Sequence, residues 1–377
     1  MTVDPDLTNV EPSGRRFLAL APLVRAIGLA GDARKLILGV AGLALLLAGW
    51  GVIDAAFGVD PREVGQIDPA ATIRLFDGPT NPRWTDAAWL VSEPARTVVG
   101  PFFAVFSRGV GVRPWFLAVL MGIWALVVWG IIGGAIARIA VVRLTVGGGV
   151  GIGSAIRFAL RRALALIGAP MTPFLAVALI ALGCGGFGLL YRIPAGIGAL
   201  IAGVFGFIPL IGGLVMALIL IGLALGWPLM HATVATEGED VADALSRSYS
   251  YVNQRLIRYL AHVGAAWLLG VVGLVVAVVF ARVVLGLADW SVSLGAPARP
   301  TTTPFADTMR EFWTAVVGWL VHAYLYSYFW SAASAIYLTL RQDVDGTDPH
   351  DVYLPEQAAD TFAGGPSTTS PEQPVEA

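Results

Sequence analysis

The sequence predicts an all-α, polytopic membrane protein, a bundle of about six transmembrane helices joined by amphipathic elbow helices. Hydrophobic residues make up 56% of the chain and charged residues 13%, which is about half the charged fraction of a soluble protein. The mean hydropathy is +0.74. No Asp, Glu, Lys or Arg occurs between Arg192 and Glu237. A surface with so few charges is typical of a protein that contacts lipid.

The same composition excludes several classes of function. A net charge of −2 argues against a nucleic-acid partner, because no basic stripe is available to neutralise phosphates. Cys184 is the single cysteine, so neither a disulfide nor a thiolate metal site can form within one chain. The histidines lack ligand spacing on one helix, and no nucleophile–base motif is visible. We therefore predict no catalytic, metal-binding or cofactor-binding residues.

Residues 1–35 are expected to hold a disordered acidic tail and an amphipathic helix at the membrane surface. The apolar side of this helix repeats at helical spacing and comprises Phe17, Leu20, Val24 and Ile27. Arginines at positions 15, 16 and 25 are available for its polar side.

Residues 36–341 are predicted to form the transmembrane domain. Six apolar runs approach the roughly 20 residues that cross a bilayer. They are 36–57, 114–137, 173–191, 209–232, 259–285 and 312–338. Between the third and fourth, the 37 residues from Ala195 to His231 would extend about 55 Å as one helix, too far for a single pass. We expect a break at Phe207–Pro209, with a re-entrant or interfacial helix at 195–207. If 195–207 crosses completely, the chain has seven passes.

With six passes, one side of the membrane receives fourteen Arg and Lys residues and the other side ten. This excess predicts that both termini are cytoplasmic. Residues 58–113 then form a long non-cytoplasmic loop, whose end is expected to rest on the membrane through Phe102, Phe103 and Phe106. Residues 342–377 contain eight acidic residues and no Arg or Lys, and they are predicted to be a disordered acidic tail.

Two cytoplasmic elbows share a pattern in which a short amphipathic helix with arginines runs directly into the next pass. The repetition suggests a duplicated pass–elbow–pass unit. In the second elbow, Asp243 and Arg247 have the spacing of an ion pair on one helix. The basic residues of the elbows are candidates for binding lipid headgroups or a partner: Arg157, Arg161, Arg162, Arg247 and Arg255.

His322 lies well inside the last predicted pass, and Tyr326 follows one turn later. An ionisable group within the membrane calls for a functional hypothesis, although a neutral histidine bonded across helices explains it too. No carboxylate or lysine lies near the middle of the predicted passes, which argues against a proton- or sodium-coupled transporter.

Several short motifs resemble a known group of proteins. They are Glu237-Gly, then Asp243 to Ser248, then Arg255, and a final pass that ends at Ala335 to Arg341. Over roughly residues 114–345 the chain resembles the multi-pass membrane domain fused to some bacterial glycerophosphodiester phosphodiesterases, and its uncharacterised stand-alone relatives. No run of alternating strands and helices could build the catalytic barrel of those enzymes. The resemblance implies a membrane scaffold without that activity.

The leading hypothesis is a non-enzymatic protein of the bacterial inner membrane whose elbows form a cytoplasmic platform for lipid or for a membrane or cytoplasmic protein partner. The alternative is a permease or lipid-translocating protein. A cavity reaching His322 would favour the alternative.

Overall fold

A computed structural model of the chain describes residues 20–57, 84–105, 111–194, 196–295, 303–348 and 350–353. Within these ranges the protein is helical and contains no β-strand, which confirms the predicted all-α class. In chain order the helices are α1 (Ala21–Ala30), α2 (Ala33–Phe57), α3 (Trp84–Val91), α4 (Glu93–Ala104), α5 (Val112–Thr145), α6 (Ile152–Arg161), α7 (Ala163–Gly188), a 3₁₀ helix η4 (Leu189–Arg192), α8 (Ile197–Val204), α9 (Phe207–Glu237), α10 (Val241–Gln254), α11 (Leu256–Ser293) and α12 (Pro304–Asp345).

Five helices in this part of the chain are long and apolar enough to cross a membrane: α2, α5, α7 with η4, α9 and α11. They contain five of the six predicted passes, so the chain is a multi-pass membrane protein. The sixth predicted pass, 312–338, lies inside the 42-residue α12, which is not among the five. Tyr, Trp, Ser and His side chains replace aliphatic ones along α12 and make it less apolar.

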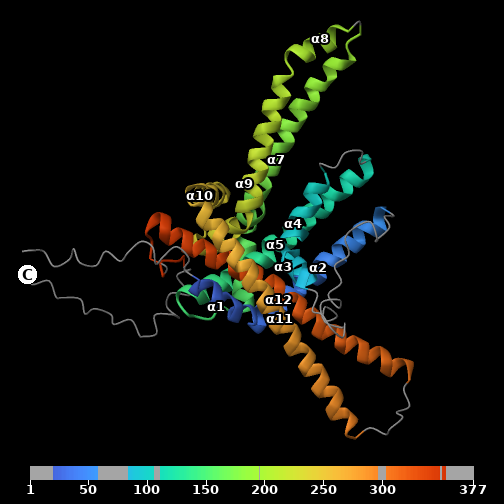
Figure 1. Ribbon diagram of the computed structural model, residues 1–377, viewed down its shortest axis with the longest axis vertical. Coiled ribbons are helices and arrows are strands. Elements are labelled where there is room, and N and C mark those ends of the chain that lie inside the picture. Colours follow the sequence, from blue (N-terminus) through green and yellow to red (C-terminus); the bar gives the residue numbers. More distant parts are fainter. Residues whose placement is uncertain are drawn as a thin grey trace, which may run out of the picture.

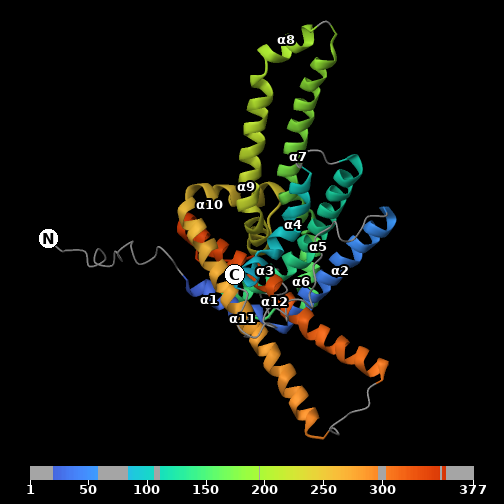
Figure 2. The ribbon, with the colours of Figure 1, turned by 45° about the vertical axis from the view of Figure 1, so that its right-hand side comes forward.

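The helices meet in a hub, which we define as residues 322–345 of α12 and the parts of α1, α2, α5, α9 and α11 that pack on α12. Two long hairpins leave the hub in different directions, one formed by α7 and α9 and the other by α11 and α12 (Figures 1 and 2). The outer halves of these hairpins expose aliphatic side chains such as Leu179, Leu214 and Val276. Lipid contact makes such exposure favourable.

The segment predicted to be re-entrant or a seventh pass forms α8, at the tip of the α7–α9 hairpin (Figure 1). Its 8 residues extend about 12 Å, less than half the thickness of a hydrocarbon core. This segment therefore does not make a full crossing. The break that follows agrees with the prediction, because α9 begins at Phe207.

The end of loop 58–113 differs from its prediction. Phe102 was expected to lie on the membrane surface, but it is buried and stacks on Phe174 of α7, with 4.0 Å between ring centroids. Gly122 of α5 leaves room for the Phe102 ring. Phe106 and the side chain of Phe103 lie outside the described residues. Helix α4 therefore packs against α5, because an aromatic ring gains more by complete burial than at the interface.

Helix α1 packs into the bundle through a face other than the predicted apolar side. Leu23, Ala26 and Ala30 are buried, whereas Leu20 and Val24 are 41% and 54% exposed. The small alanines allow α1 to approach α12 closely, and Ser327 Oγ of α12 donates to the Ala30 carbonyl oxygen at 2.8 Å. Helix α1 is thus part of the hub. Phe17 lies outside the described residues.

The two elbows have matching geometry. Helix α5 is followed by Gly147 and α9 by Gly238, each with a φ of +68°, where a left-handed residue turns the chain into the elbow helix. The elbow helices end at Arg162 and Arg255, and each of these arginines is also the N-cap of the next long helix. The structure therefore supports the predicted duplication of a pass–elbow–pass unit.

We expect Gly147→Ala to reduce the free energy of unfolding by about 1 kcal/mol, because a side chain disfavours a positive φ. Gly238→Ala should cost more, since its Cβ would also lie 2.9 Å from Cδ1 of Tyr353. Thermal unfolding of the detergent-purified variants, followed by circular dichroism, measures both changes. The matched control is Gly264→Ala inside α11, where nothing lies within 4 Å of the new Cβ. This control should be neutral or stabilising, and an equal loss in all three variants would contradict the prediction.

Candidate functional site

The first elbow helix, α6, presents basic and apolar side chains together. Ala155 and Ala159 are buried, and α6 packs against α5. On the outer side Arg157 and Arg161 are exposed. Leu160 is 55% exposed, and Leu164 at the start of α7 is 81% exposed. This outer surface therefore combines positive charge with aliphatic side chains that water would not favour.

The second elbow repeats this combination where α10 meets α11. Arg255 is exposed. The next two residues, Leu256 and Ile257, are 41% and 76% exposed. Arg258 turns inward, where its guanidinium lies 2.8 Å from Asp343 of α12.

Arg247 has a different environment. Its guanidinium lies 2.5 Å from Glu239 Oε1 and 4.0 Å from Glu237 Oε1. Glu239 thus takes the place of Asp243, the partner predicted for Arg247. Asp240 is the N-cap of α10, and its side chain accepts from Ala242 N and Asp243 N. Arg247 is therefore largely neutralised within the protein.

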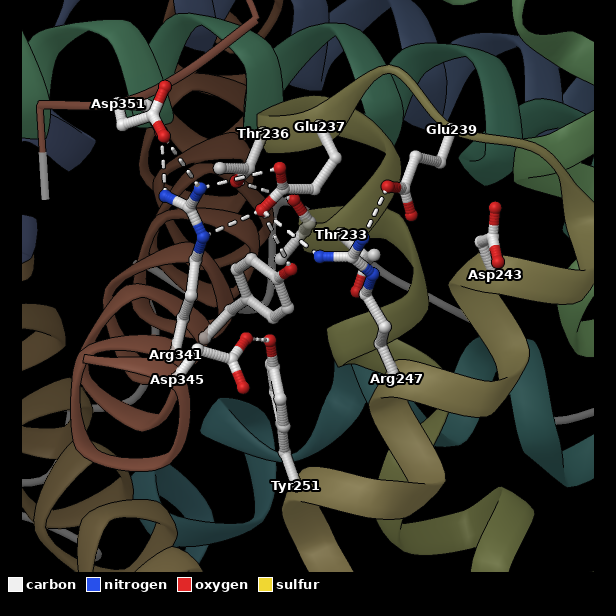
Figure 3. Close-up of polar contacts among 12 residues, drawn as sticks. Thr233, Thr236, Glu237, Glu239, Asp243, Arg247, Tyr251, Arg341, Asp345 and Asp351 are labelled. Carbon is white, nitrogen blue, oxygen red and sulfur yellow. Dashed lines mark hydrogen bonds and ion pairs between the residues drawn. The ribbon is translucent and has the colours of Figure 1, made fainter. Parts of the chain in front are cut away.

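Glu237, at the end of α9, is the centre of an ion network (Figure 3). Its Oε1 lies 2.7 Å from Arg341 Nε of α12 and accepts a hydrogen bond from the Tyr337 hydroxyl at 3.2 Å. Arg341 is only 4% exposed. The network ties the ends of α9 and α12 to α10 through Arg247, and it fixes the direction in which the second elbow leaves the hub.

A second contact between α10 and α12 joins Tyr251 to Asp345, whose carboxylate accepts from the tyrosine hydroxyl. Burial raises the pKa of Tyr251 to about 12, and the hydrogen bond and negative charge of Asp345 add to that shift. Burial also raises the pKa of Glu239, with Arg247 acting in the opposite direction.

Residues 346–348 and 350–353 form a strap that follows α12 and folds back over the end of α9. Tyr353 N donates to the Thr236 carbonyl oxygen at 2.9 Å, and Arg138 of α5 donates to the carbonyl oxygens of Ala235 and Tyr353 at 2.7 and 2.5 Å. Arg162 lies over the Tyr353 ring at 5.7 Å from its centroid. The prediction of a disordered tail from residue 342 is therefore wrong for 342–348 and 350–353, because backbone hydrogen bonds and Arg138 order this segment. Residues 354–377 lie outside the described residues.

The two predicted intramembrane residues come together with a carboxylate. His322 Nε2 lies 2.7 Å from Glu93 Oε1 of α4, and the Tyr326 hydroxyl donates to the same oxygen at 3.1 Å. Thr97 Oγ1 lies 3.1 Å from the Tyr326 hydroxyl. His322 and Tyr326 are 0% exposed, and Trp129 stacks on the Tyr326 ring with 4.2 Å between centroids.

A buried lysine of α2 contacts α12 further along that helix, at Ser331. Lys35 Nζ of α2 donates to Ser331 Oγ at 2.8 Å, and both residues are 0% exposed. Ser331 in turn donates to the Ser327 carbonyl oxygen at 2.6 Å.

Sequence reasoning missed Glu93 and Lys35. Glu93 was assigned to an outer loop, and Lys35 precedes the apolar part of its pass. One signal was available for Lys35, which is the only lysine in the chain. Neither residue lies in the middle of a predicted pass, but the structure places both of them against α12. Among the described residues, no three His, Cys, Asp or Glu side chains are grouped as a metal site requires.

Comparison with known proteins returned no matching family model, no matching curated protein and no matching solved structure.

We expect Glu237→Gln to reduce the free energy of unfolding by about 3 kcal/mol, because it leaves the buried Arg341 guanidinium without its closest negative charge. Thermal unfolding in detergent measures the change.

The control for this variant is Asp289→Asn. Asp289 pairs with Arg310 at 3.3 Å, but both side chains are about 70% exposed, so its loss should cost about 0.5 kcal/mol or less. If Glu237→Gln were as stable as Asp289→Asn, the ion network would not hold the hub together.

Proposed function

We propose that this protein is a non-enzymatic scaffold of the bacterial inner membrane, with both termini in the cytoplasm, and that its elbow helices bind anionic lipid headgroups. The observation that supports this proposal is the same at both elbows. An exposed arginine adjoins exposed aliphatic side chains at the point where an elbow helix turns into a long apolar helix.

The physical argument starts from Leu164 and Ile257, which are 81% and 76% exposed. Burial of such a side chain is worth about 1.5 kcal/mol or more. At the boundary between headgroups and acyl chains, these residues enter the apolar layer while Arg161 and Arg255 stay level with the phosphates. A lipid surface therefore accommodates both the exposed aliphatic side chains and the exposed arginines.

The proposal keeps three of the five arginines that the sequence predicted to bind lipid headgroups. Arg157, Arg161 and Arg255 are exposed and form the proposed headgroup surface. Arg247 is paired with Glu239, and Arg162 lies over Tyr353. We assign these two residues to positioning the elbows.

The proposed relationship to the phosphodiesterase-associated membrane domain has one supporting observation. Glu237, Arg247 and Arg341, which carry much of the resemblance, belong to one ion network. A shared scaffold would require these residues to hold the elbow in place.

A second candidate function, a permease or lipid-translocating protein, is favoured by the polar side chains buried along α12. His322, Ser331 and Arg341 follow one another over 19 residues, a helical distance of about 29 Å that is close to the thickness of a hydrocarbon core.

We expect Arg157→Glu combined with Arg161→Glu to weaken binding of phosphatidylglycerol about 30-fold, because each arginine near the surface contributes about 1 kcal/mol. Native mass spectrometry of the purified chain, titrated with this lipid, counts the bound molecules.

Arg310→Glu is the matched control, because Arg310 is exposed on the N-terminal part of α12, far from the elbows. Phosphatidylcholine and inorganic phosphate serve as control ligands. Equal binding of phosphatidylglycerol to wild type and the double variant would refute the lipid proposal, and would leave a protein partner as the occupant of this surface.

A further inference from the structure

Glu93 reaches the interior of the bundle from a part of the chain that was predicted to lie outside it. The side chain is 12% exposed, so it is largely enclosed but keeps some contact with solvent. Its Oε1 faces both the His322 ring nitrogen, at 2.7 Å, and the Tyr326 hydroxyl, at 3.1 Å. A carboxylate oxygen with two polar neighbours within hydrogen-bond distance is suited to carrying negative charge.

The other ionisable groups around this cluster are few. On α4 the nearest cation is Arg96, whose guanidinium lies 3.4 Å from the centre of the Trp89 ring. Helix α3 carries Asp86, and α5 has no titratable side chain between Arg113 and Arg138. On α12 the groups are His322 and Tyr326, with Tyr324 and Tyr328 beside them bonded to backbone oxygens elsewhere. The charge on Glu93 therefore depends on His322, on the positive charge of Arg96 and on the remaining contact of the Glu93 side chain with solvent.

The same cluster supplies polar contacts between α4 and α12. Elsewhere α4 makes apolar contacts, such as buried Val98 and the stack of Phe102 on Phe174, and Arg96 donates to Ser92 and Trp89. Apolar packing keeps its strength when protons bind, whereas the contacts of Glu93 do not. The α4–α12 contact thus depends on the protonation of Glu93.

We propose that Glu93 and His322 form a proton-binding site inside the bundle, and that a proton taken up by Glu93 weakens the attachment of α4 to α12. The proton comes from water that reaches the exposed part of the Glu93 side chain. One O–H bond forms on the carboxylate, and no other covalent bond changes. The carboxylate charge is lost, and both His322 and Tyr326 then face a weak acceptor. This site is independent of the lipid surface at the elbows.

The sign of the effect identifies which group binds the proton. Protonation of His322 alone would strengthen its attraction to the Glu93 carboxylate. Loss of α4 attachment on acidification therefore reports protonation of Glu93.

Hydrogen–deuterium exchange of the full chain in lipid nanodiscs tests the proposal. Between about pH 8 and about pH 3.5, which spans the titration of histidine and most of that of glutamate, exchange of α4 amides should accelerate about tenfold after correction for the intrinsic rate. Amides in the middle of α5 should not change. Glu93→Gln, which imitates the protonated carboxyl, should exchange at the fast rate at both pH values.

Glu311→Gln is the matched control, because Glu311 is an exposed carboxylate on α12 and its loss should leave the pH response intact. If α4 is equally protected at both pH values, or if Glu93→Gln keeps the wild-type response, the proposal is wrong.

A second measurement on the unmodified chain guards against misfolding of the variant. Dicyclohexylcarbodiimide reacts with protonated carboxyl groups in apolar surroundings, and peptide mass spectrometry locates the adduct. Labelling of Glu93 that increases on acidification, with Glu311 unlabelled, supports the site. Absence of labelling at Glu93 across the same range overturns it.

Discussion

The structure depends on one constraint, which is that the polar side chains buried along α12 must find partners inside an apolar bundle. Leaving a buried polar group without a hydrogen bond costs about 1 to 3 kcal/mol, and more for a charge. His322 is matched by Glu93 of α4, Ser331 by Lys35 of α2, and Arg341 by Glu237 of α9. Each pair fixes the position of one helix against α12, so these three contacts organise the hub.

The positions of the elbows follow from these contacts. Arg341 holds Glu237 at the end of α9, and the chain then turns at Gly238 into α10. The start of α10 is therefore fixed in position. Arg247 of α10 also lies near Glu237 and joins the same ion network. The arginines that remain exposed, such as Arg161 and Arg255, lie where the elbow helices end. Structural and surface arginines thus alternate within the same short segments, which explains how one elbow can be rigid and still expose positive charge.

The interior of the bundle contains two charged side chains, Glu93 and Lys35, that the sequence did not place there. A carboxylate and a lysine were absent from the middle of every predicted pass, yet Glu93 and Lys35 lie against α12. Both come from positions where hydropathy is low, one in an outer loop and one at the start of a helix. Neither residue lies in the middle of a predicted pass, and both charges reach the interior through their contacts with α12.

The sequence by itself determined that the chain is all-α, where five apolar helices run, where the α8–α9 break falls and that two elbows repeat, because hydropathy and glycine placement are local properties. It also identified His322, Tyr326 and the elbow arginines as the residues to examine. Only the tertiary structure decided that Glu93 lies 2.7 Å from His322, that Arg247 pairs with Glu239, and that residues 350–353 lie over α9. These contacts join residues on different helices, or on a helix and the loop beside it, and the choice among several chemically suitable partners depends on how the helices pack in three dimensions.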